Sequence, residues 1–390
     1  MKILQVHNYY QYSGGEDVVL KNEHELLTSK KHTVLQYLKN NSEIANYSSF
    51  QKGKLFFETS YSKKSYREIL ELLKVEKPDV AHVHNTLPLI TPAVYYACNE
   101  LNIPVVQTLH NYRLLCSNAY LFRNGKVCEE CIGKSLYHSL KYGCYRDSRI
   151  QTFALARMIE KHSKLGTWST KIDAYIALTN FSKKKFVEGG LPEDKIIVKP
   201  NFLSSDLGFN YNTQNYFLFA GRLDITKGIE VILEANKNVN QNAKILIAGD
   251  GSFKDKVISV FNENFLGQLN HNALMKYLKD STALIFPSPL FENMPLTIVE
   301  TFASGKPVIA SNLGAMAELI EDGRTGLLFE PGDSKDLAEK INWAYTHKEE
   351  MRQMGINARK EYEEKYTAEK NYKILMDIYE KAIEYRRKRS

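Results

Sequence analysis

Short runs of β-branched residues alternate along this chain with longer segments of helical period. In the first half this pattern predicts strands at 2–6, 79–83 and 104–109 and helices at 16–27 and 92–101. Strands that are joined by crossover helices pair in parallel, because each helix returns the chain to the same edge of the sheet. The sequence therefore predicts an open parallel sheet covered by helices.

The same alternation starts again in the second half. It predicts strands and helices that follow one another at 216–220, 228–236, 244–248, 252–262, 283–286, 296–304 and 307–310. Between the two series, residues 201–215 are rich in Asn and Ser and keep no sustained period, which is typical of a hinge or linker. We therefore expect an α/β protein with two Rossmann-like, doubly wound parallel-sheet domains that face a central cleft.

The linker and the final helical segment set the expected domain boundaries. We expect an N-terminal domain at 1–205, a C-terminal domain at 206–365, and a last helix at 366–390 that packs back on the N-terminal domain. With 43% hydrophobic and 25% charged residues, the chain is an ordinary folded protein rather than a disordered one. No window approaches eighteen uninterrupted apolar residues and the opening residues resemble a strand, so we expect a cytoplasmic protein.

Two cations lie in the loop that follows the predicted strand at 216–220, namely Arg222 and Lys227. Loops at the carboxyl ends of parallel strands form the ligand-binding edge of such sheets. A forked guanidinium and a point-charge ammonium together suit a diphosphate. The alternative is a pair of solvated side chains, which is the common fate of exposed charges.

A second strand-to-helix loop, at 286–300, offers complementary groups. The residues around the start of its helix, where free backbone amides form a ready anion site, are Asn293, Met294, Pro295 and Leu296. Glu292 precedes this helix, whereas Glu300 lies inside it. Because a carboxylate inside the helix cannot cap the N-terminus, Glu300 needs another partner, such as ribose hydroxyls.

These two loops resemble a known family. The segment Gly-Arg-Leu-Asp-Ile-Thr-Lys-Gly at 221–228, together with two glutamates that have seven residues between them, is similar to the retaining family 4 (group 1) glycosyltransferases of GT-B fold, of the bacterial surface-polysaccharide type. Supporting segments are 14–15, 79–85, 108–111, 247–251, 265–267 and 323–328. The resemblance covers nearly the whole chain.

The resemblance implies a role for each site residue. The donor's diphosphate would be held by Arg222 and Lys227, its ribose by Glu300, and its sugar hydroxyls by Glu292. The base would lie near Gly267, and His110 would line the reaction centre. The remaining donor-binding positions are Gly15, Gly249, Asn293, Met294, Pro295 and Leu296.

The resemblance also implies the activity. A hexose or related sugar would pass from a nucleotide-diphosphate donor in the C-terminal domain to a glycan acceptor in the N-terminal domain, with retention of configuration. No cofactor would be required, since protein cations would replace Mg²⁺ and no Asp-x-Asp triplet stands in a suitable loop. Capsule, exopolysaccharide or O-antigen biosynthesis is the setting that the family suggests.

Four of the five cysteines fall within one stretch of the first half, with the spacing C-x11-C-x2-C-x12-C: Cys116, Cys128, Cys131 and Cys144. Structural zinc sites use four such ligands, so a structural zinc in an insert at 116–144 is one interpretation. Ordinary reduced thiols are the other, and disulfides do not suit a cytoplasmic chain. Cys98 lies on a helical segment and is expected in the core.

Two segments of the first half combine basic and aromatic residues, at 52–67 and at 134–171. The second holds eight basic residues against two acidic ones. Such segments suit an anionic bilayer surface, although charge runs are often only solvated. We expect a lipid-linked saccharide acceptor, peripheral attachment at the inner face of the cell membrane, and no nucleic-acid partner.

Two other functions stay open. A nucleotide-sugar 2-epimerase would handle the donor in the same way but would need no acceptor. A zinc-ordered nucleic-acid-binding protein would use the cysteines and the basic segments, but it leaves the cations and carboxylates of the second half unexplained. A dinucleotide-dependent oxidoreductase fits less well, because Gly249-Asp250-Gly251 lacks the third glycine of that fingerprint.

Overall fold

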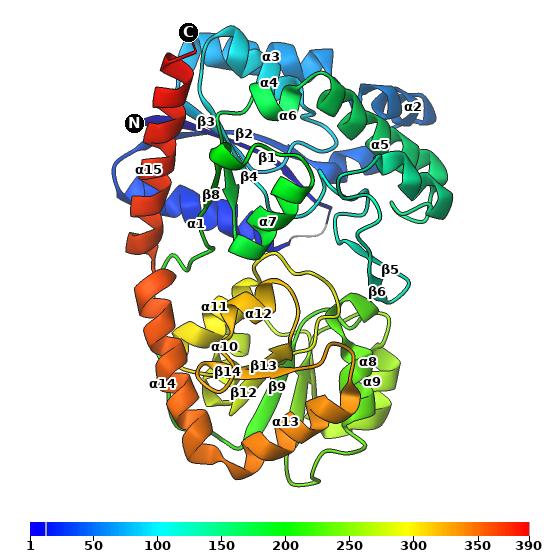
Figure 1. Ribbon diagram of the computed structural model, residues 1–390, viewed down its shortest axis with the longest axis vertical. Helices are drawn as coiled ribbons and strands as arrows, with labels where there is room; N and C mark the ends of the chain where they lie inside the picture. Colours follow the sequence, from blue (N-terminus) through cyan, green and yellow to red (C-terminus); the bar gives the residue numbers. More distant parts are fainter. Residues whose placement is uncertain (12–13, 390) are drawn as a thin grey trace. The chain divides into compact units, whose positions relative to one another are not determined.

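The computed structural model describes residues 1–11 and 14–389, and it divides the chain into two compact units (Figure 1). The first unit consists of Met1–Leu121, Glu129–Pro200 and Asn371–Ser390, and the second of Phe122–Cys128 and Asn201–Lys370. The chain therefore enters the second unit after Pro200 and returns to the first after Lys370. These crossings lie close to the boundaries at 205 and 365 that the sequence suggests.

The first unit is built on a parallel six-stranded sheet in the order β2-β1-β3-β4-β7-β8. Its strands are β1 (Lys2–Tyr9), β2 (Thr33–Asn40), β3 (Val80–Val83), β4 (Val105–Thr108), β7 (Ala174–Ala177) and β8 (Ile196–Val198). Its helices are α1 (Gly15–Ser29), α2 (Ser49–Glu58), α3 (Lys63–Glu76), α4 (Ala93–Glu100), η2 (Leu136–Tyr142), α5 (Arg149–Lys164), α6 (Thr167–Thr170), α7 (Asn180–Glu188) and α15 (Ala368–Arg387).

The second unit repeats this plan with the strand order β11-β10-β9-β12-β13-β14. Its strands are β9 (Tyr216–Ala220), β10 (Lys244–Ala248), β11 (Phe265–Gly267), β12 (Ala283–Phe286), β13 (Val308–Ser311) and β14 (Gly326–Phe329). Its helices are η4 (Ile225–Lys227), α8 (Ile229–Ala235), α9 (Lys254–Phe261), α10 (His271–Asp280), α11 (Leu296–Ala303), α12 (Ala315–Leu319), α13 (Ser334–Thr346) and α14 (Lys348–Lys365). The prediction of two Rossmann-like parallel-sheet domains is therefore confirmed.

Burial explains why these segments form parallel sheets. The strands β3, β4, β7, β12 and β13 are buried along their whole length, as expected for strands covered by helices on both faces. In the second unit one apolar cluster joins the sheet to its covering helices, through residues such as Phe217, Ile232 and Leu337. The rigid sheet then holds the loops that follow each strand at one common edge.

The last helix, α15, belongs to the first unit from Asn371 onward. Its Tyr379 is fully buried, and the Tyr379 hydroxyl lies 2.8 Å from His82 Nδ1 on β3. Near the end of the helix, Arg386 Nη2 donates to Asp173 Oδ2 at 2.6 Å. Both contacts are buried, so α15 contributes to the core of the first unit.

A small hairpin departs from the predicted domain plan. The strands β5 (Phe122–Arg123) and β6 (Lys126–Val127) pair only with each other and enter neither six-stranded sheet. The sequence places this segment in the N-terminal domain, but the structure groups it with the second unit. No helix in the described part of the chain is both long and apolar enough to cross a bilayer.

Candidate active site

The two loops that the sequence singles out in the second unit follow neighbouring strands. In the strand order, β9 lies between β10 and β12, so the chain changes direction across the sheet at β9 and β12. Open α/β sheets bind ligands at such a switch point, at the carboxyl ends of the strands. The loop after β9 carries Arg222 and Lys227, and the loop after β12 carries Glu292.

The structure brings two of these predicted site residues into direct contact. Lys227 Nζ donates to Glu292 Oε1 at 2.6 Å, and both side chains are largely buried. Ser288 Oγ lies 2.9 Å from the same carboxylate oxygen and 3.1 Å from the Thr226 carbonyl oxygen. The carboxylate therefore holds the ammonium group in place beside the switch point.

A glycine allows the two loops to pack this closely. Gly228 adopts the left-handed conformation with φ +71°, and a Cβ atom there would stand 1.9 Å from the Pro287 carbonyl oxygen. Only glycine avoids both the conformational cost and the steric clash. The close approach places Lys227 next to the loop that carries Glu292.

Arg222 is held less firmly. Its side chain is 59% exposed, with Nη2 donating to Thr226 Oγ1 at 3.3 Å and Nη1 3.5 Å from Asp224 Oδ2. Exposed ion pairs of this length contribute little free energy. The guanidinium is therefore able to exchange these partners for an anionic ligand.

Helix α11 presents the other predicted groups of this edge. It begins at Leu296, and Pro295 stands just before it at the N-cap. No side chain caps this helix, so its first backbone amides keep their capacity to bind an anion. Asn293 and Met294 are buried, and Met294 also has a structural contact, since its carbonyl oxygen accepts from Asn201 Nδ2 at 2.9 Å.

Glu300 lies on α11, with a side chain only 13% exposed. His271 lies close to this carboxyl, with Nδ1 3.7 Å from Glu300 Oε1. Burial raises the pKa of the Glu300 carboxyl, and His271 offsets this only in part. A buried carboxyl with a raised pKa beside a ligand-binding edge is typical of a functional group.

The two predicted site glycines of the second unit, Gly249 and Gly267, have different structural roles. Gly249 follows β10 with φ +149°, and a Cβ atom there would lie 1.9 Å from the Gly221 carbonyl oxygen, so this glycine is needed for the fold. Its amide donates to the Gly267 carbonyl oxygen at 2.8 Å. Gly267, by contrast, faces open space, since no atom lies within 4 Å of its Cβ position.

In the first unit the corresponding switch point lies between β1 and β3. His110 follows β4, and His84 follows β3. The two imidazoles are joined by a contact of 2.9 Å between His84 Nδ1 and His110 Nε2. Burial lowers the pKa of His110 to about 3, so this histidine is neutral at physiological pH.

Gly15 is the first residue of α1, and the structure adds its neighbour Glu16 to the site. Glu16 Oε1 accepts from Asn85 Nδ2 at 3.0 Å, and Glu16 Oε2 accepts from Asn111 Nδ2 at 3.2 Å. Burial, followed by repulsion from Asp17, raises the pKa of Glu16 to about 8. A carboxyl group that titrates near neutral pH is therefore linked to the loops after β3 and β4.

A small cavity of about 60 Å³ opens among these loops. Its polar lining includes Asn85, His110, Asn111 and Arg113. Sequence reasoning overlooked Glu16, His84 and Arg113. The available signal was position, because His84 and Arg113 lie in segments that follow β3 and β4, and Glu16 lies in the first turn of the helix that follows β1.

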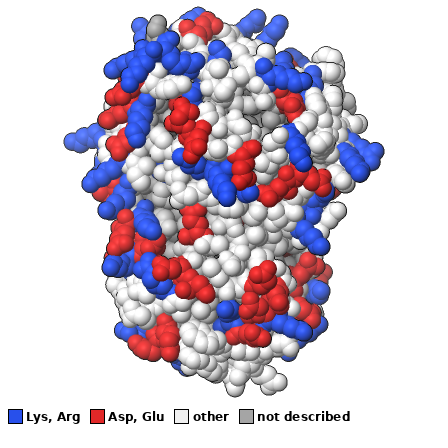
Figure 2. Space-filling model, in the orientation of Figure 1, with Lys and Arg blue, Asp and Glu red and all other residues white. Residues whose placement is uncertain are grey.

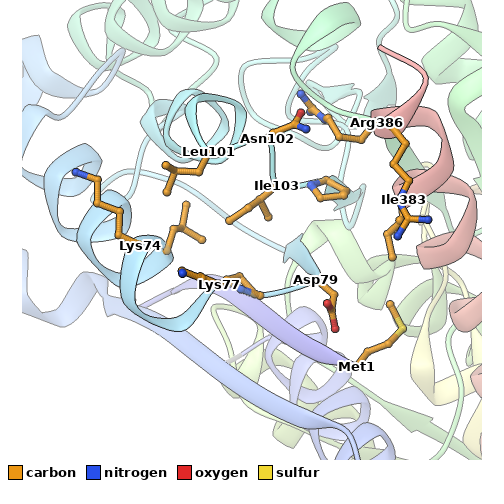
Figure 3. A pocket seen from close by; sticks show the side chains of 13 residues that line it. Met1, Lys74, Lys77, Asp79, Leu101, Asn102, Ile103, Ile383 and Arg386 are labelled. Atoms are coloured by element: carbon orange, nitrogen blue, oxygen red, sulfur yellow. The ribbon is translucent and has the colours of Figure 1, made fainter. Parts of the chain in front are cut away.

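A larger cavity of about 740 Å³ lies at the other edge of the first sheet (Figure 3). It is lined by residues that precede strands, such as Asp79 and Pro104, and by Lys77 and Arg386. Ligands of open α/β sheets bind at the opposite, carboxyl edge. We therefore do not assign this cavity to the active site.

The four cysteines of the predicted zinc site are divided between the two units. Among the described residues, the groups of three metal-ligand atoms within 4.8 Å of one another contain no cysteine. Cys116 Sγ donates to Asn118 Oδ1 at 3.0 Å, and Cys128 belongs to the segment grouped with the second unit. The structural zinc stays a prediction. Cys98 is fully buried, as expected.

The basic and aromatic residues of the first unit lie on neighbouring helices. Helices α2 and α5 pack together, with the Phe56 and Phe153 rings stacked at 6.4 Å and Arg157 Nη2 donating to the Phe57 carbonyl oxygen at 3.3 Å. Trp168, which the sequence includes in this surface, is buried instead. On the face drawn in Figure 2, basic and acidic side chains are interspersed, unlike the single-signed surface of a nucleic-acid binder.

Family models match both halves of the chain. Residues 47–207 match "Glycosyltransferase Family 4", and residues 208–361 match "Glycosyl transferases group 1". The chain is also 26% identical to the uncharacterized glycosyltransferase MJ1178 of Methanocaldococcus jannaschii, over 97% of this chain and 98% of that protein. It is 26% identical to the O-antigen chain mannosyltransferase C of Escherichia coli, over 44% of this chain and 47% of that protein.

Solved structures share the fold. The Anabaena protein HepE, solved in complex with UDP-glucose, superposes with a TM-score of 0.66 and 18% identity, over 97% of this chain and 99% of that one. Its likeness supports the GT-B arrangement of two Rossmann-like domains. The two family matches adjoin and leave little of the chain outside them. The chain therefore belongs to the group 1 glycosyltransferase family and is a transferase.

Proposed function

We propose that the protein transfers a hexose or related sugar from a nucleotide-diphosphate donor to a lipid-linked glycan acceptor, with retention of configuration. One observation supports this most strongly. At the switch point of the second sheet, a half-exposed Arg222 and a Lys227 held by Glu292 stand beside the uncapped start of α11. These groups match a diphosphate in charge and a sugar in hydrogen-bonding capacity.

The same groups suit the reaction. The bond between the anomeric carbon and the diphosphate oxygen breaks, and negative charge develops on the leaving phosphate. Arg222, Lys227 and the amides of α11 stabilise that charge, which is the role that Mg²⁺ has in other transferases. A new bond forms between the anomeric carbon and the acceptor oxygen on the same face, while the leaving phosphate takes the acceptor's proton.

The relatives support the donor and the setting. HepE has been solved in complex with UDP-glucose, which makes a UDP-sugar the first donor to test. The Escherichia coli relative is an O-antigen chain mannosyltransferase. We propose that this protein acts in capsule, exopolysaccharide or O-antigen biosynthesis.

The proposal is tested by incubating the protein with a panel of UDP-, GDP- and TDP-sugars and a lipid-linked acceptor, in the presence of EDTA. We expect release of nucleoside diphosphate from one donor only when the acceptor is present, and a product whose anomeric proton keeps the donor's configuration by NMR. An inverted product would refute retention. Loss of activity in EDTA that Mg²⁺ restores would refute metal independence, and turnover without acceptor would favour an epimerase.

We further propose that the first unit attaches to the inner face of the cell membrane through the surface of α2, η2 and α5. This surface exposes large apolar side chains among basic ones: Phe50, Phe57, Tyr137, Tyr142, Ile150, Phe153 and Leu165 with Lys52, Lys54, Lys141, Arg149, Lys161 and Lys164. Apolar groups that enter the interface and cations that attract anionic lipids together favour reversible binding.

Sedimentation with anionic vesicles at low salt should recover the wild type, and the variant F50S/F57S/I150S should stay in solution. Equal recovery of both proteins, or of neither, would contradict this attachment.

A structural zinc on Cys116, Cys128, Cys131 and Cys144 is a separate proposal, supported by their spacing. Metal analysis of the purified protein should find zinc in the wild type and none in the quadruple Cys→Ser variant. Zinc-free wild-type protein that is fully folded would refute it.

A further inference from the structure

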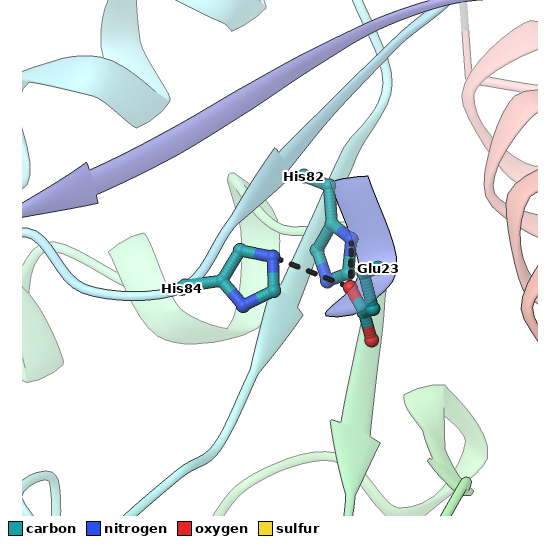
Figure 4. A group of neighbouring side chains, drawn as sticks. All are labelled: Glu23, His82 and His84. Atoms are coloured by element: carbon teal, nitrogen blue, oxygen red, sulfur yellow. Dashed lines mark ion pairs between the residues drawn. The ribbon is translucent and has the colours of Figure 1, made fainter. Parts of the chain in front are cut away.

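A buried ionic cluster lies beneath His110 in the first unit. Glu23 on α1 and His82 on β3 are fully buried (Figure 4). Lys199, which follows β8, is fully buried as well. Charged side chains are almost never fully buried unless they are paired with another group. The reaction proposed above uses none of these three residues.

The two oxygens of the Glu23 carboxylate face different partners. Oε1 accepts from Lys199 Nζ at 2.7 Å, and Lys199 Nζ also donates to Asn371 Oδ1 at 3.1 Å. Oε2 faces the histidines, at 3.4 Å from His84 Nε2 and 3.5 Å from His82 Nδ1. Figure 4 shows both rings directed at this oxygen.

Of the two rings, His84 depends more on the carboxylate. His82 already has a hydroxyl at each nitrogen, Tyr379 at Nδ1 and Thr108 at Nε2, both at 2.8 Å. His84 Nε2 and Glu23 Oε2 are both buried, and neither makes a regular hydrogen bond within the described part of the chain. At 3.4 Å, each is the nearest suitable partner of the other.

The protonation states of this cluster follow from its surroundings. Burial alone would raise the pKa of Glu23, but the Lys199 ammonium holds it below its ordinary value, so Glu23 is a carboxylate that only accepts hydrogen bonds. Burial lowers the pKa of His84 and of His110, so both rings are neutral. A neutral imidazole has one donating and one accepting nitrogen, and the partner of one nitrogen decides the role of the other.

We propose that Glu23, acting through His84, is a positioning residue that fixes the tautomer of His110. His84 Nε2 donates toward Glu23, so His84 Nδ1 accepts, and His110 Nε2 donates to it across 2.9 Å. His110 Nδ1 is then left as an acceptor for a substrate hydroxyl. The role of His110 Nδ1 toward a substrate rests on the proposed function. The positions of the protons on His84 and His110 do not.

A metal ion is the other arrangement that three such ligands suggest, since the ligand atoms of Glu23, His82 and His84 lie within 4.8 Å of one another. Two observations disfavour it. Lys199 places an ammonium on the same carboxylate, which repels a second cation. Both nitrogens of His82 already have hydroxyl partners.

The variant Glu23→Gln reverses the proposed order by changing one atom. Lys199 needs an acceptor, so it keeps the amide oxygen on its side and directs the amide NH₂ toward His84. His84 Nε2 must then accept, its Nδ1 donates, and His110 Nε2 becomes the acceptor. We expect the ¹⁵N resonances of labelled His110, assigned with a His110→Gln variant, to show the proton on Nε2 in the wild type and on Nδ1 in Glu23→Gln.

Glu23→Gln leaves the buried Lys199 ammonium without a counter-charge, which destabilises the fold. A second variant therefore removes this cation as well. E23Q/K199Q removes the cation and keeps an amide donor toward the new side chain, so it should give the same reversed tautomer. Asn371→Ala is the matched structural control, since it removes the other acceptor of Lys199. We expect Asn371→Ala to lower the melting temperature but to keep the wild-type tautomer.

The outcomes are distinct. An unchanged His110 tautomer in both Glu23 variants, or a wild-type proton on Nδ1, would overturn the inference. If a donor is identified, Glu23→Gln should lower kcat about tenfold or more while Asn371→Ala stays near wild type. A reversed tautomer in a protein that transfers no sugar would refute the proposed function and leave the inference standing.

Discussion

The two sheet edges use charge in opposite ways. In the second unit the charged side chains lie at or near the surface, and Arg222 is more than half exposed. In the first unit the paired charges of Glu23 and Lys199 are fully buried, and His110, which lines the small cavity, is neutral.

This difference separates two tasks. An exposed cation in a weak pair, such as Arg222, can exchange its partner for a ligand's phosphates at little cost. A buried pair such as Glu23 and Lys199 cannot exchange partners, because an uncompensated charge in the interior is strongly destabilising. We therefore propose that the second edge binds and releases an anion, whereas the first holds a neutral group in one orientation.

The largest effect should come from removing both cations of the second edge, Arg222 and Lys227. We expect the double variant R222A/K227A to lower turnover on the order of 10⁴-fold, since each lost donor to a developing oxyanion costs about 3 kcal/mol. Steady-state kinetics measures this loss. Lys237→Ala, which removes an exposed lysine of the same unit, is the control. Similar turnover rates for the double variant and the control would show that turnover does not need these two cations, which would contradict the comparison of the two edges.

The next largest effect concerns the backbone of the second edge. Gly249→Ala should destabilise the unit by about 3 kcal/mol, because the methyl group meets the Gly221 carbonyl oxygen and the conformation is strained. Gly267→Ala, which meets no atom within 4 Å, should cost only about 1 kcal/mol for its left-handed φ. Urea denaturation measures both, and an equal cost would contradict this distinction.

Glu300→Gln should act on donor binding rather than on stability. A hydrogen bond to a charged group contributes about 1.5–3 kcal/mol, so the donor KM should rise about tenfold or more. The exposed Glu234→Gln, in the same unit, should leave KM unchanged. A normal KM in Glu300→Gln would remove this residue from the donor site.

A further effect is a pH dependence in the first unit. The pKa of Glu16 is raised from 4.5 to about 8 in the folded protein, so between these values the folded chain holds a proton that the unfolded chain releases. Stability from this group is therefore lost as the pH rises through that window. The stability of Glu16→Gln relative to the wild type should increase between about pH 5 and about pH 8.5. A constant difference in melting temperature would show that Glu16 titrates normally.

The sequence predicts the repeated architecture well, because buried parallel strands and their helices leave strong patterns. The helix predicted at 296–304 is observed at Leu296–Ala303. The strand β2 was missed, since its residues alternate between exposed and half-buried at the edge of the sheet. The strands β7, β8, β11 and β14 were missed as well, and each has only three or four residues. The hairpin β5–β6 was missed because each of its strands has two residues.

The two sheet edges also differ in how far their contacts could be predicted from the sequence. The contact between Lys227 and Glu292 was within reach of sequence reasoning, because both follow strands and so meet at one edge. The contact between Glu23 and Lys199 was not, since 176 residues separate them and neither lies in a recognisable motif. Buried pairs of this kind appear only once the sheet has placed distant segments side by side.

The most direct test of the account is calorimetric titration with UDP, GDP and TDP in the presence of EDTA, for the wild type and for R222A/K227A. We expect one nucleotide to bind the wild type without any divalent ion and the double variant to lose at least 100-fold in affinity, or about 2.7 kcal/mol. Binding that requires Mg²⁺, or that is equally tight in both proteins, would contradict the claim that protein cations hold the diphosphate.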